Sequence, residues 1–257
     1  WLDPSTVFTL IGFASCLAFL PVCMMDFSRP WHKRGMEQEK ELGRAWKSAC
    51  SAVLSNSGLW LAGALEMLVY LVTYSIKAFM PLYALFVADF NLLAVGLFFT
   101  VQEAAHLAMR PLGGRLGDRV GYLTAINAGY FALVIGLSLL PYATAHAELL
   151  AIAVVLGAGQ GLIFPSTVAF VSRCVDARHL GIGMGFLGAV RNFGKVAGPV
   201  GAGALLTRMD YSQVFHLGGV AALLVVMALL LLQRNYLEAI FLRAKLTTPS
   251  EDEAMLR

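Results

Sequence analysis

The chain has 257 residues, of which 58% are hydrophobic and 14% are charged, and its formal net charge is +3. Soluble domains are about 45–50% apolar and about 25% charged, so this composition argues against a soluble enzyme, a disordered chain and a nucleic-acid-binding protein. Because a bilayer-spanning helix needs about 20 mostly apolar residues, the composition predicts an all-α, multi-pass integral membrane protein.

Seven apolar stretches in the sequence are each long enough to cross a bilayer. A segment rich in Lys, Arg and Glu, residues 26–50, separates the first stretch from the second, and a polar tail, residues 234–257, follows the last. The sequence therefore predicts seven transmembrane helices. They cover residues 5–25, 59–84, 91–112, 122–141, 148–172, 180–206 and 213–233.

Basic residues are unevenly distributed over the connections between these stretches. Fifteen of the 19 Lys and Arg residues lie in the alternate connections that share one side of the membrane, whereas Arg208 alone lies in a connection on the opposite side. Because cytoplasmic loops carry an excess of Lys and Arg, the basic side is predicted to be cytoplasmic. The C-terminus is then cytoplasmic, and the membrane is expected to be a plasma membrane or a cell inner membrane.

The connection after the third stretch, residues 110–123, is rich in glycine. Gly113, Gly114, Gly117 and Gly121 permit positive φ and close backbone approach, so this segment is predicted to be a tight turn. Asp118 is suited to accept hydrogen bonds from helix-terminal amides or to pair with a nearby Arg. A Gly-rich turn without a special function is the alternative.

The spacing within this segment resembles a known family signature. Gly114-x-Leu116-x-Asp118-Arg119-x-Gly121 is similar to the loop between the second and third helices of major facilitator superfamily transporters, which recurs in degenerate form between the eighth and ninth. A basic pair should follow the last glycine, but Tyr and Leu stand there, which favours the degenerate copy. The resemblance implies that Gly114, Asp118, Arg119 and Gly121 form a gating turn that helps to latch one conformational state.

Two further segments resemble the same family. Residues 158–165 are similar to its fourth or tenth helix, and Gly157 stands three residues before Gln160, where a first-half helix carries Arg. Residues 191–203 are similar to its Gly-rich fifth or eleventh helix. Their GPxGxG pattern departs from the GPxxGG of antiporters, so antiport is not implied.

The resemblance implies one six-helix major-facilitator-type bundle plus one extra N-terminal helix. A full member has twelve helices in two related halves, so about five helices of the N-terminal half are expected to be missing. The opposite register, with the last six stretches as helices one to six, is disfavoured by Gly157, by the residues after Gly121 and by the polar tail. The expected segments are a last N-terminal-half helix in 1–25, a central cytoplasmic loop in 26–50, a C-terminal half in 51–233 and a cytoplasmic tail in 234–257.

Five charged residues lie within the apolar stretches, where burial of charge is costly and usually marks a polar path. At 1.5 Å per residue, Glu103 and Arg191 lie about 14 Å and about 16 Å from the cytoplasmic ends of their stretches. Because opposite charges at matched depth compensate each other, we expect these two to reach each other or a shared substrate group. A static structural ion pair is the alternative. The five residues are Glu66, Lys77, Glu103, Arg191 and Lys195.

The second stretch places Glu66, Tyr70, Tyr74 and Lys77 on one helical face. Tyrosines beside charged groups are typical of ligand cavities, because each offers an apolar ring and a hydroxyl. Lys77 is predicted to lie near the external edge of the membrane and to snorkel towards water. Glu66 lies deeper and is expected to need a partner.

The third stretch places Glu103, His106 and Arg110 on one face. A carboxylate beside an imidazole predicts a proton relay, because His titrates near neutrality. The alternative is that His106 hydrogen-bonds Glu103 and simply packs.

In the sixth stretch, Lys195 follows Arg191 by one helical turn, so the two cations share a face. Like charges at this spacing repel unless an anion or carboxylate intervenes. The pattern favours an anionic ligand or a second pairing with Glu66.

The resemblance implies secondary active transport of a small solute by alternating access, in a permease or efflux transporter. The expected partners are a small-molecule substrate, a coupling proton or other ion, the lipid bilayer and the missing N-terminal half, with no nucleic acid. An inactive partial or half-size transporter and a seven-helix receptor are the alternatives. The expected path is lined by Glu66, Tyr70, Tyr74, Glu103, His106, Gln160, Arg191 and Lys195.

Enzymatic activity, a cofactor and a metal are not expected. The sequence contains no HExxH, GxSxG, P-loop or haem motif, and its four cysteines form no CxxC pair. The last stretch also lacks the Lys that a retinal-binding receptor needs.

Overall fold

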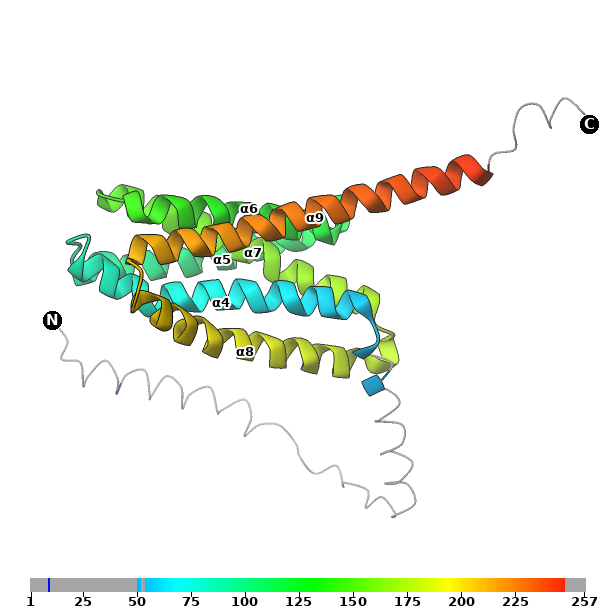
Figure 1. Ribbon diagram of the computed structural model, residues 1–257, viewed down its shortest axis with the longest axis horizontal. Coiled ribbons are helices and arrows are strands. Elements are labelled where there is room, and N and C mark those ends of the chain that lie inside the picture. Colours follow the sequence, from blue (N-terminus) through cyan, green and yellow to red (C-terminus); the bar gives the residue numbers. More distant parts are fainter. Residues whose placement is uncertain (1–8, 10–49, 52–53, 248–257) are drawn as a thin grey trace, which may run out of the picture. The chain divides into compact units, whose positions relative to one another are not determined.

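The computed structural model describes residue 9, residues 50–51 and residues 54–247, with side chains as far as residue 233. Nearly all of these residues belong to one of the chain's two compact units, Ser48–Arg257. Within the described residues the regular structure is entirely helical (Figure 1). The elements are α4 (Ser57–Phe86), α5 (Leu92–Val120), α6 (Tyr122–Leu139), η1 (Leu140–Tyr142), α7 (His146–Cys174), η2 (Ala177–His179), α8 (Leu180–Leu206) and α9 (Tyr211–Thr247).

The six long helices coincide with the last six predicted stretches, and α9 continues past the last of these as far as Thr247. All of them except α8 are long and apolar enough to cross a membrane, which supports an integral membrane protein. α8 is less apolar because Arg191 and Lys195 interrupt its middle. The predicted span 5–25 and loop 26–50 lie outside the described residues except for Thr9 and Cys50, so the count of seven stays a prediction.

Two asparagines fix where the first two long helices begin. The side chain of Asn56 accepts hydrogen bonds from the N–H groups of Gly58 (2.9 Å) and Leu59 (3.3 Å), and that of Asn91 accepts one from Ala94 (2.8 Å). The first N–H groups of a helix have no partner within it, so each side chain stabilises a helix start.

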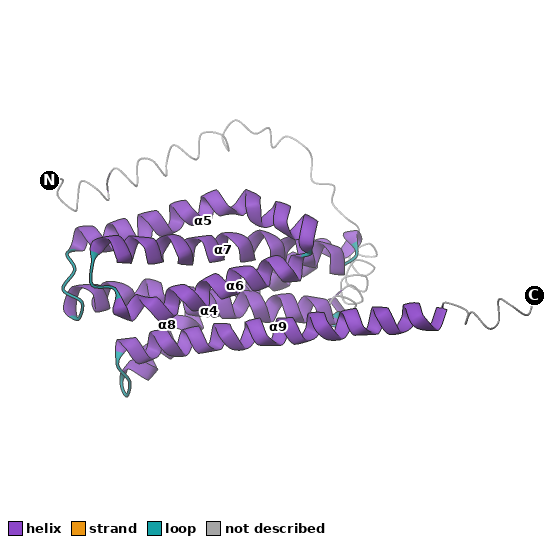
Figure 2. Cartoon of the chain, turned by 90° about the horizontal axis from the view of Figure 1, so that it is seen from above, coloured by secondary structure: helices purple, strands orange, loops and turns teal. Residues whose placement is uncertain are grey.

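The bundle is built from close helix pairs. α7 packs against both α5 and α6 (Figure 2), whereas α8 packs along α4 and α9 packs along α6 (Figure 1). At the α6–α7 contact, a Cβ added to Gly129 or to Gly159 would lie 2.7 Å from the carbonyl oxygen of the other. At the α4–α8 contact, a Cβ on Gly194 would lie 2.6 Å from the Met67 carbonyl oxygen. Small residues therefore let these backbones approach closely, as in other membrane helices.

The Gly-rich segment after the third stretch is mostly helix, so the predicted tight turn over residues 110–123 is wrong. α5 continues through the motif to Val120, and the chain turns only at Gly121, whose φ of +96° favours glycine. Gly113 packs against α7, where a Cβ would lie 2.7 Å from the Gly161 carbonyl oxygen. Gly113 therefore allows close packing of α5 on α7. A pattern of glycines in the sequence does not distinguish such a packing site from a turn.

Contacts between the connections define the two ends of the bundle. At one end, the Arg173 guanidinium at the end of α7 lies 5.5 Å from the Tyr122 ring at the start of α6. At the other end, the Tyr83 hydroxyl donates to the Pro141 carbonyl (3.0 Å), and its ring lies 6.1 Å from that of Tyr211. Alternate connections therefore meet at the same end.

Candidate functional site

Side chains from α4, α5, α7 and α8 are joined by hydrogen bonds, ion pairs and ring contacts into one network, which we call the interhelix cluster. It includes every residue of the expected path except Gln160. Its members are Glu66, Tyr70, Tyr74, Lys77, Glu103, His106, Arg110, Phe164, Thr167, Arg191 and Lys195.

The interhelix cluster lies within the central part of the helices. Glu66 is nine residues from the start of α4, and Lys77 is nine residues from its end. At 1.5 Å per residue, Glu66 lies about 14 Å from the start of α4, and Lys77 lies about 14 Å from its end. The Lys77 side chain is 35% exposed and pairs with Glu103, and its position at the external edge of the membrane stays a prediction.

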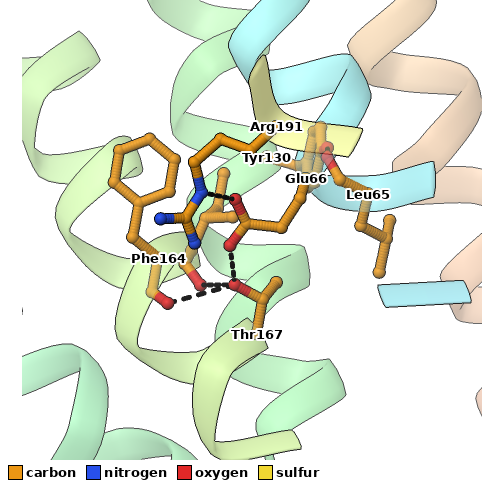
Figure 3. A network of polar contacts seen from close by, with 7 residues as sticks. Leu65, Glu66, Tyr130, Phe164, Thr167 and Arg191 are labelled. Atoms are coloured by element: carbon orange, nitrogen blue, oxygen red, sulfur yellow. Dashed lines mark hydrogen bonds and ion pairs between the residues drawn. The ribbon is translucent and has the colours of Figure 1, made fainter. Parts of the chain in front are cut away.

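Glu66 is the most enclosed charge of the cluster. Its side chain is 0% exposed, and each carboxylate oxygen has its own partner. The Thr167 hydroxyl from α7 donates to Oε1, and Arg191 Nε from α8 donates to Oε2 at 3.2 Å (Figure 3). Next to it, the buried Tyr130 hydroxyl donates to the Leu65 carbonyl and fastens α6 to α4. The carboxylate thereby links three helices through hydrogen bonds that compensate its burial.

Glu103 belongs to a second group of polar contacts. Its Oε1 accepts from Lys77 Nζ at 2.8 Å, and its Oε2 lies 3.3 Å from His106 Nδ1, which confirms the predicted Glu103–His106 contact. Arg110 Nε donates to His106 Nε2 at 3.3 Å. Because Nε2 accepts, the geometry fits a neutral imidazole whose proton is on Nδ1 and faces Glu103.

The predicted direct pairing of Glu103 with Arg191 is wrong. Both residues instead pair with α4, Glu103 with Lys77 and Arg191 with Glu66. Depth along a helix does not fix the direction in which a side chain points, and α4 reaches both α5 and α8. A substrate group shared by Glu103 and Arg191 stays a prediction.

Aromatic rings connect the polar contacts around Glu66 with those around Glu103. Tyr70 stacks on Phe164 with ring centroids 4.8 Å apart, and Phe164 lies 5.0 Å from the His106 ring. Lys195 Nζ lies 5.3 Å from the Tyr70 ring and 5.6 Å from the Tyr74 ring. The pairing of Lys195 with Glu66 expected as one possibility is not formed. These contacts place Lys195 over π faces rather than beside a carboxylate.

Two members of the cluster, Phe164 and Thr167, were missed by sequence reasoning. Both lie within the predicted stretch 148–172, and Phe164 also belongs to segment 158–165. Phe164 follows Gln160 by one helical turn, and Thr167 follows Ile163 by one turn. Helical spacing from Gln160 was the available signal. Gln160 itself is buried, and its Nε2 has no hydrogen-bond partner among the described residues.

The predicted gating residues lie at the α5–α6 end of the bundle. Asp118 accepts a 2.6 Å hydrogen bond from the Tyr122 hydroxyl, and Tyr122 in turn lies under the Arg173 guanidinium. Tyr122 stands where the family pattern has a basic residue. Arg119 is exposed, and no atom lies within 4 Å of a Cβ added to Gly114. The structure thus joins Asp118, but not Arg119 or Gly114, to a contact between helices.

Comparison with known proteins identifies relatives among transporters. A 35% identical segment of 109 residues is shared with an MFS-type transporter of Mycobacterium tuberculosis, covering 40% of this chain and 18% of that protein. The multi-drug resistance efflux pump PmrA of Streptococcus pneumoniae is 26% identical over 219 residues, covering 82% of this chain and 52% of PmrA. The riboflavin transporter RibZ of Clostridioides difficile is 28% identical over 102 residues, covering 40% and 22%.

These matches span about half of the relatives' length or less. The family model described as Major Facilitator Superfamily matches residues 67–249, which include five of the six long helices whole and α4 from Met67 to its end. The match covers the interhelix cluster except Glu66, together with the motif that ends α5. The chain belongs to the major facilitator superfamily.

Proposed function

We propose that this chain performs secondary active transport of a small solute by alternating access, as the C-terminal half of a permease or efflux transporter. The observation that carries the proposal is the buried Glu66, held by Thr167 and Arg191 between α4, α7 and α8. Ionisable groups at such a depth are costly and by default line a substrate or ion path. The names of the relatives, a riboflavin transporter and a multi-drug efflux pump, support transport rather than covalent chemistry.

The polar contacts around Glu66 and those around Glu103 suggest how an ion would couple to a solute. Protonation of Glu66 would remove its charge and weaken its hold on Arg191, which would then be free to bind a solute group. A proton taken up on His106 Nε2, in place of the Arg110 hydrogen bond, would release the Nδ1 proton to Glu103 Oε2, which lies 3.3 Å away, and would leave the imidazole neutral. Coupling arises because the proton and the solute compete for the same charged groups.

We also infer that a second six-helix half completes the path. The interhelix cluster is open on the side of this bundle, because the side chains of Glu103 and Lys77 are 49% and 35% exposed. A companion half covering this side would exclude lipid and water and enclose a solute. Asp118, Tyr122 and Arg173 would hold one conformational state at the α5–α6 end. Without the companion, we expect the chain to be an inactive partial transporter.

The test is a flux measurement in proteoliposomes with an imposed pH gradient. The 257-residue chain and the same chain joined to a companion half are compared, with riboflavin and 2-naphthoate as solutes. Flux should appear only with the companion, and Glu66→Gln or Arg191→Gln should lower it by about tenfold or more, as expected for loss of a charged hydrogen bond. Arg208→Gln, which removes a positive charge from an exposed connection, should leave it unchanged. Flux that survives both cluster substitutions contradicts the proposal.

A further inference from the structure

The interhelix cluster carries more positive than negative charge. It contains four basic side chains, Lys77, Arg110, Arg191 and Lys195, and two carboxylates, which belong to Glu66 and Glu103. Lys77 and Arg191 each pair with one of those carboxylates, and Arg110 donates to His106. Among the described residues, Lys195 alone of the four is held only by aromatic rings.

Close packing of α8 on α4 fixes the position of Lys195. Gly194, its neighbour in the chain, meets α4 so closely that a Cβ would lie 2.6 Å from the Met67 carbonyl oxygen and 3.2 Å from Tyr70 Cβ. This contact brings the half-buried Lys195 over the rings of Tyr70 and Tyr74, whose centroids are 6.0 Å apart and whose planes differ by 36°. The backbone at Lys195 is therefore fixed against α4, and among the described residues its ammonium lies over the two rings with no carboxylate paired to it.

An ammonium group of this kind favours an anion. Its contacts with the two rings are weaker than a carboxylate pair, and a low-dielectric surrounding makes an uncompensated charge costly. The carboxylates of Glu66 and Glu103 are already engaged by Arg191, Lys77 and His106. An anion brought by a ligand would therefore find its partner at Lys195.

The rings beside this cation favour a flat ligand. Tyr70 stacks on Phe164 with an interplanar angle of 21°, so this part of the cluster is already built from flat groups in contact with one another. Offset or edge-to-face ring contacts stabilise a bound ring beyond the burial of its surface alone. A planar acid would use both features at once, its charge on Lys195 and its ring against the tyrosines.

We infer that Lys195, Tyr70 and Tyr74 form a binding subsite for planar organic anions, in which a carboxylate or sulfonate meets Lys195 Nζ and an aromatic ring lies against the tyrosines. The inference rests on the proposed function, and names the class of solute that the path accepts. It excludes planar cations as preferred ligands.

Equilibrium binding to the full 257-residue chain in lipid nanodiscs tests the inference. The probes are 2-naphthoate, 2-naphthylmethylammonium and inorganic phosphate, which separate a planar acid from a planar cation and from a simple anion. Empty nanodiscs measure partition into lipid. We expect 2-naphthoate to bind above that background, the cation not to bind, and phosphate at equal concentration not to displace naphthoate.

Variants then assign the binding to the subsite. Lys195→Gln should weaken naphthoate binding about tenfold or more, as for loss of a charged hydrogen bond, whereas Lys195→Arg should keep it within about threefold. Tyr74→Leu should weaken it about fivefold through loss of the ring contact. Arg208→Gln is the matched charge control and should change nothing. The melting temperature of each variant shows whether it is folded, and Tyr74→Leu provides an independent test if Lys195→Gln is not.

Equal binding of the planar cation, displacement by phosphate, or unchanged affinity in Lys195→Gln and Tyr74→Leu would overturn the inference. Its failure is distinguishable from failure of the proposed function. Flux without naphthoate selectivity leaves transport standing and removes the planar-anion subsite. Naphthoate binding that depends on Lys195, without flux in the complete transporter, leaves the planar-anion subsite standing and removes transport.

Discussion

At the scale of single residues, burial decides what an ion pair contributes. Glu66 is 0% exposed, whereas Glu103 is 49% exposed, although each carboxylate pairs with one cation at 3.2 Å and 2.8 Å respectively. A buried carboxylate that loses its partner has no water to replace it, and an exposed one does. The shorter contact is therefore expected to be the weaker one.

Replacing the cation in each pair with Met tests this difference, because Met keeps an unbranched apolar stem and removes the charge. Arg191→Met should lower the free energy of unfolding by about 3 kcal/mol, since it leaves Glu66 buried with Thr167 alone. Lys77→Met is the matched control and should lower it by about 1 kcal/mol or less. Steric trapping in bicelles measures both values. Equal losses would show that burial of Glu66 does not set the strength of its pair.

His106 is the second residue whose role is testable. His106→Gln retains groups that can contact both Glu103 and Arg110 but cannot titrate. If the Glu103–His106 contact relays protons, solute flux in the complete transporter should lose its dependence on pH between about 5 and 8, the range in which imidazole changes charge. An unchanged pH profile would mean that His106 only packs and positions Glu103.

At the scale of elements, glycine determines how closely helices approach. Gly113 and Gly114 are adjacent in the motif, yet they face different surroundings within α5. A Cβ on Gly113 would meet backbone atoms of α7, the Gly161 carbonyl oxygen at 2.7 Å and Leu162 Cα at 3.0 Å. A Cβ on Gly114 would meet nothing within 4 Å. The same residue type therefore has opposite structural consequences one position apart.

Alanine substitutions at these two positions should have opposite effects on stability. Gly113→Ala forces α5 and α7 apart and should destabilise the chain by about 1–3 kcal/mol, the usual range for overpacking. Gly114→Ala should stabilise α5 by up to about 1 kcal/mol through helix propensity. Thermal unfolding in detergent, followed by circular dichroism, compares them. A Gly113→Ala variant as stable as Gly114→Ala would contradict the close contact between α5 and α7.

At the scale of the whole molecule, the antiparallel bundle distributes its basic residues unequally between its two ends. Arg115, Arg119, Arg173 and Arg178 belong to the end where α5 meets α6 and α7 meets α8. Among described side chains in the connections, Arg208 alone is basic at the other end. The positive-inside rule then predicts that the α5–α6 end faces the cytoplasm.

Single cysteines in the connections test this orientation. In a variant without the native cysteines, Ala177→Cys and Asp210→Cys place one thiol at each end of the bundle. A membrane-impermeant maleimide added to intact cells should label Asp210→Cys and leave Ala177→Cys unlabelled until the cells are opened. The reverse pattern would invert the topology and exclude a cytoplasmic C-terminus.

Much of the cluster was predictable from the sequence because helical periodicity fixes which residues share a face. Glu66, Tyr70, Tyr74 and Lys77 lie on one face of α4 as predicted, and His106 contacts Glu103 within α5. Those are relations within one helix. Contacts between helices were not predictable in the same way, since they depend on the rotation of each helix about its axis.

The sequence by itself determined that the chain is an all-helical membrane protein of a transporter family, because apolar length, spacing of charges and a short motif are local properties of the chain. Only the tertiary structure decided that Arg191 pairs with Glu66 and Glu103 with Lys77, that the motif is helical up to Gly121, and that Lys195 lies over two tyrosines. The physical reason is that pairing energy depends on direction and burial. Both are set when glycine contacts fix how α4, α5, α7 and α8 pack.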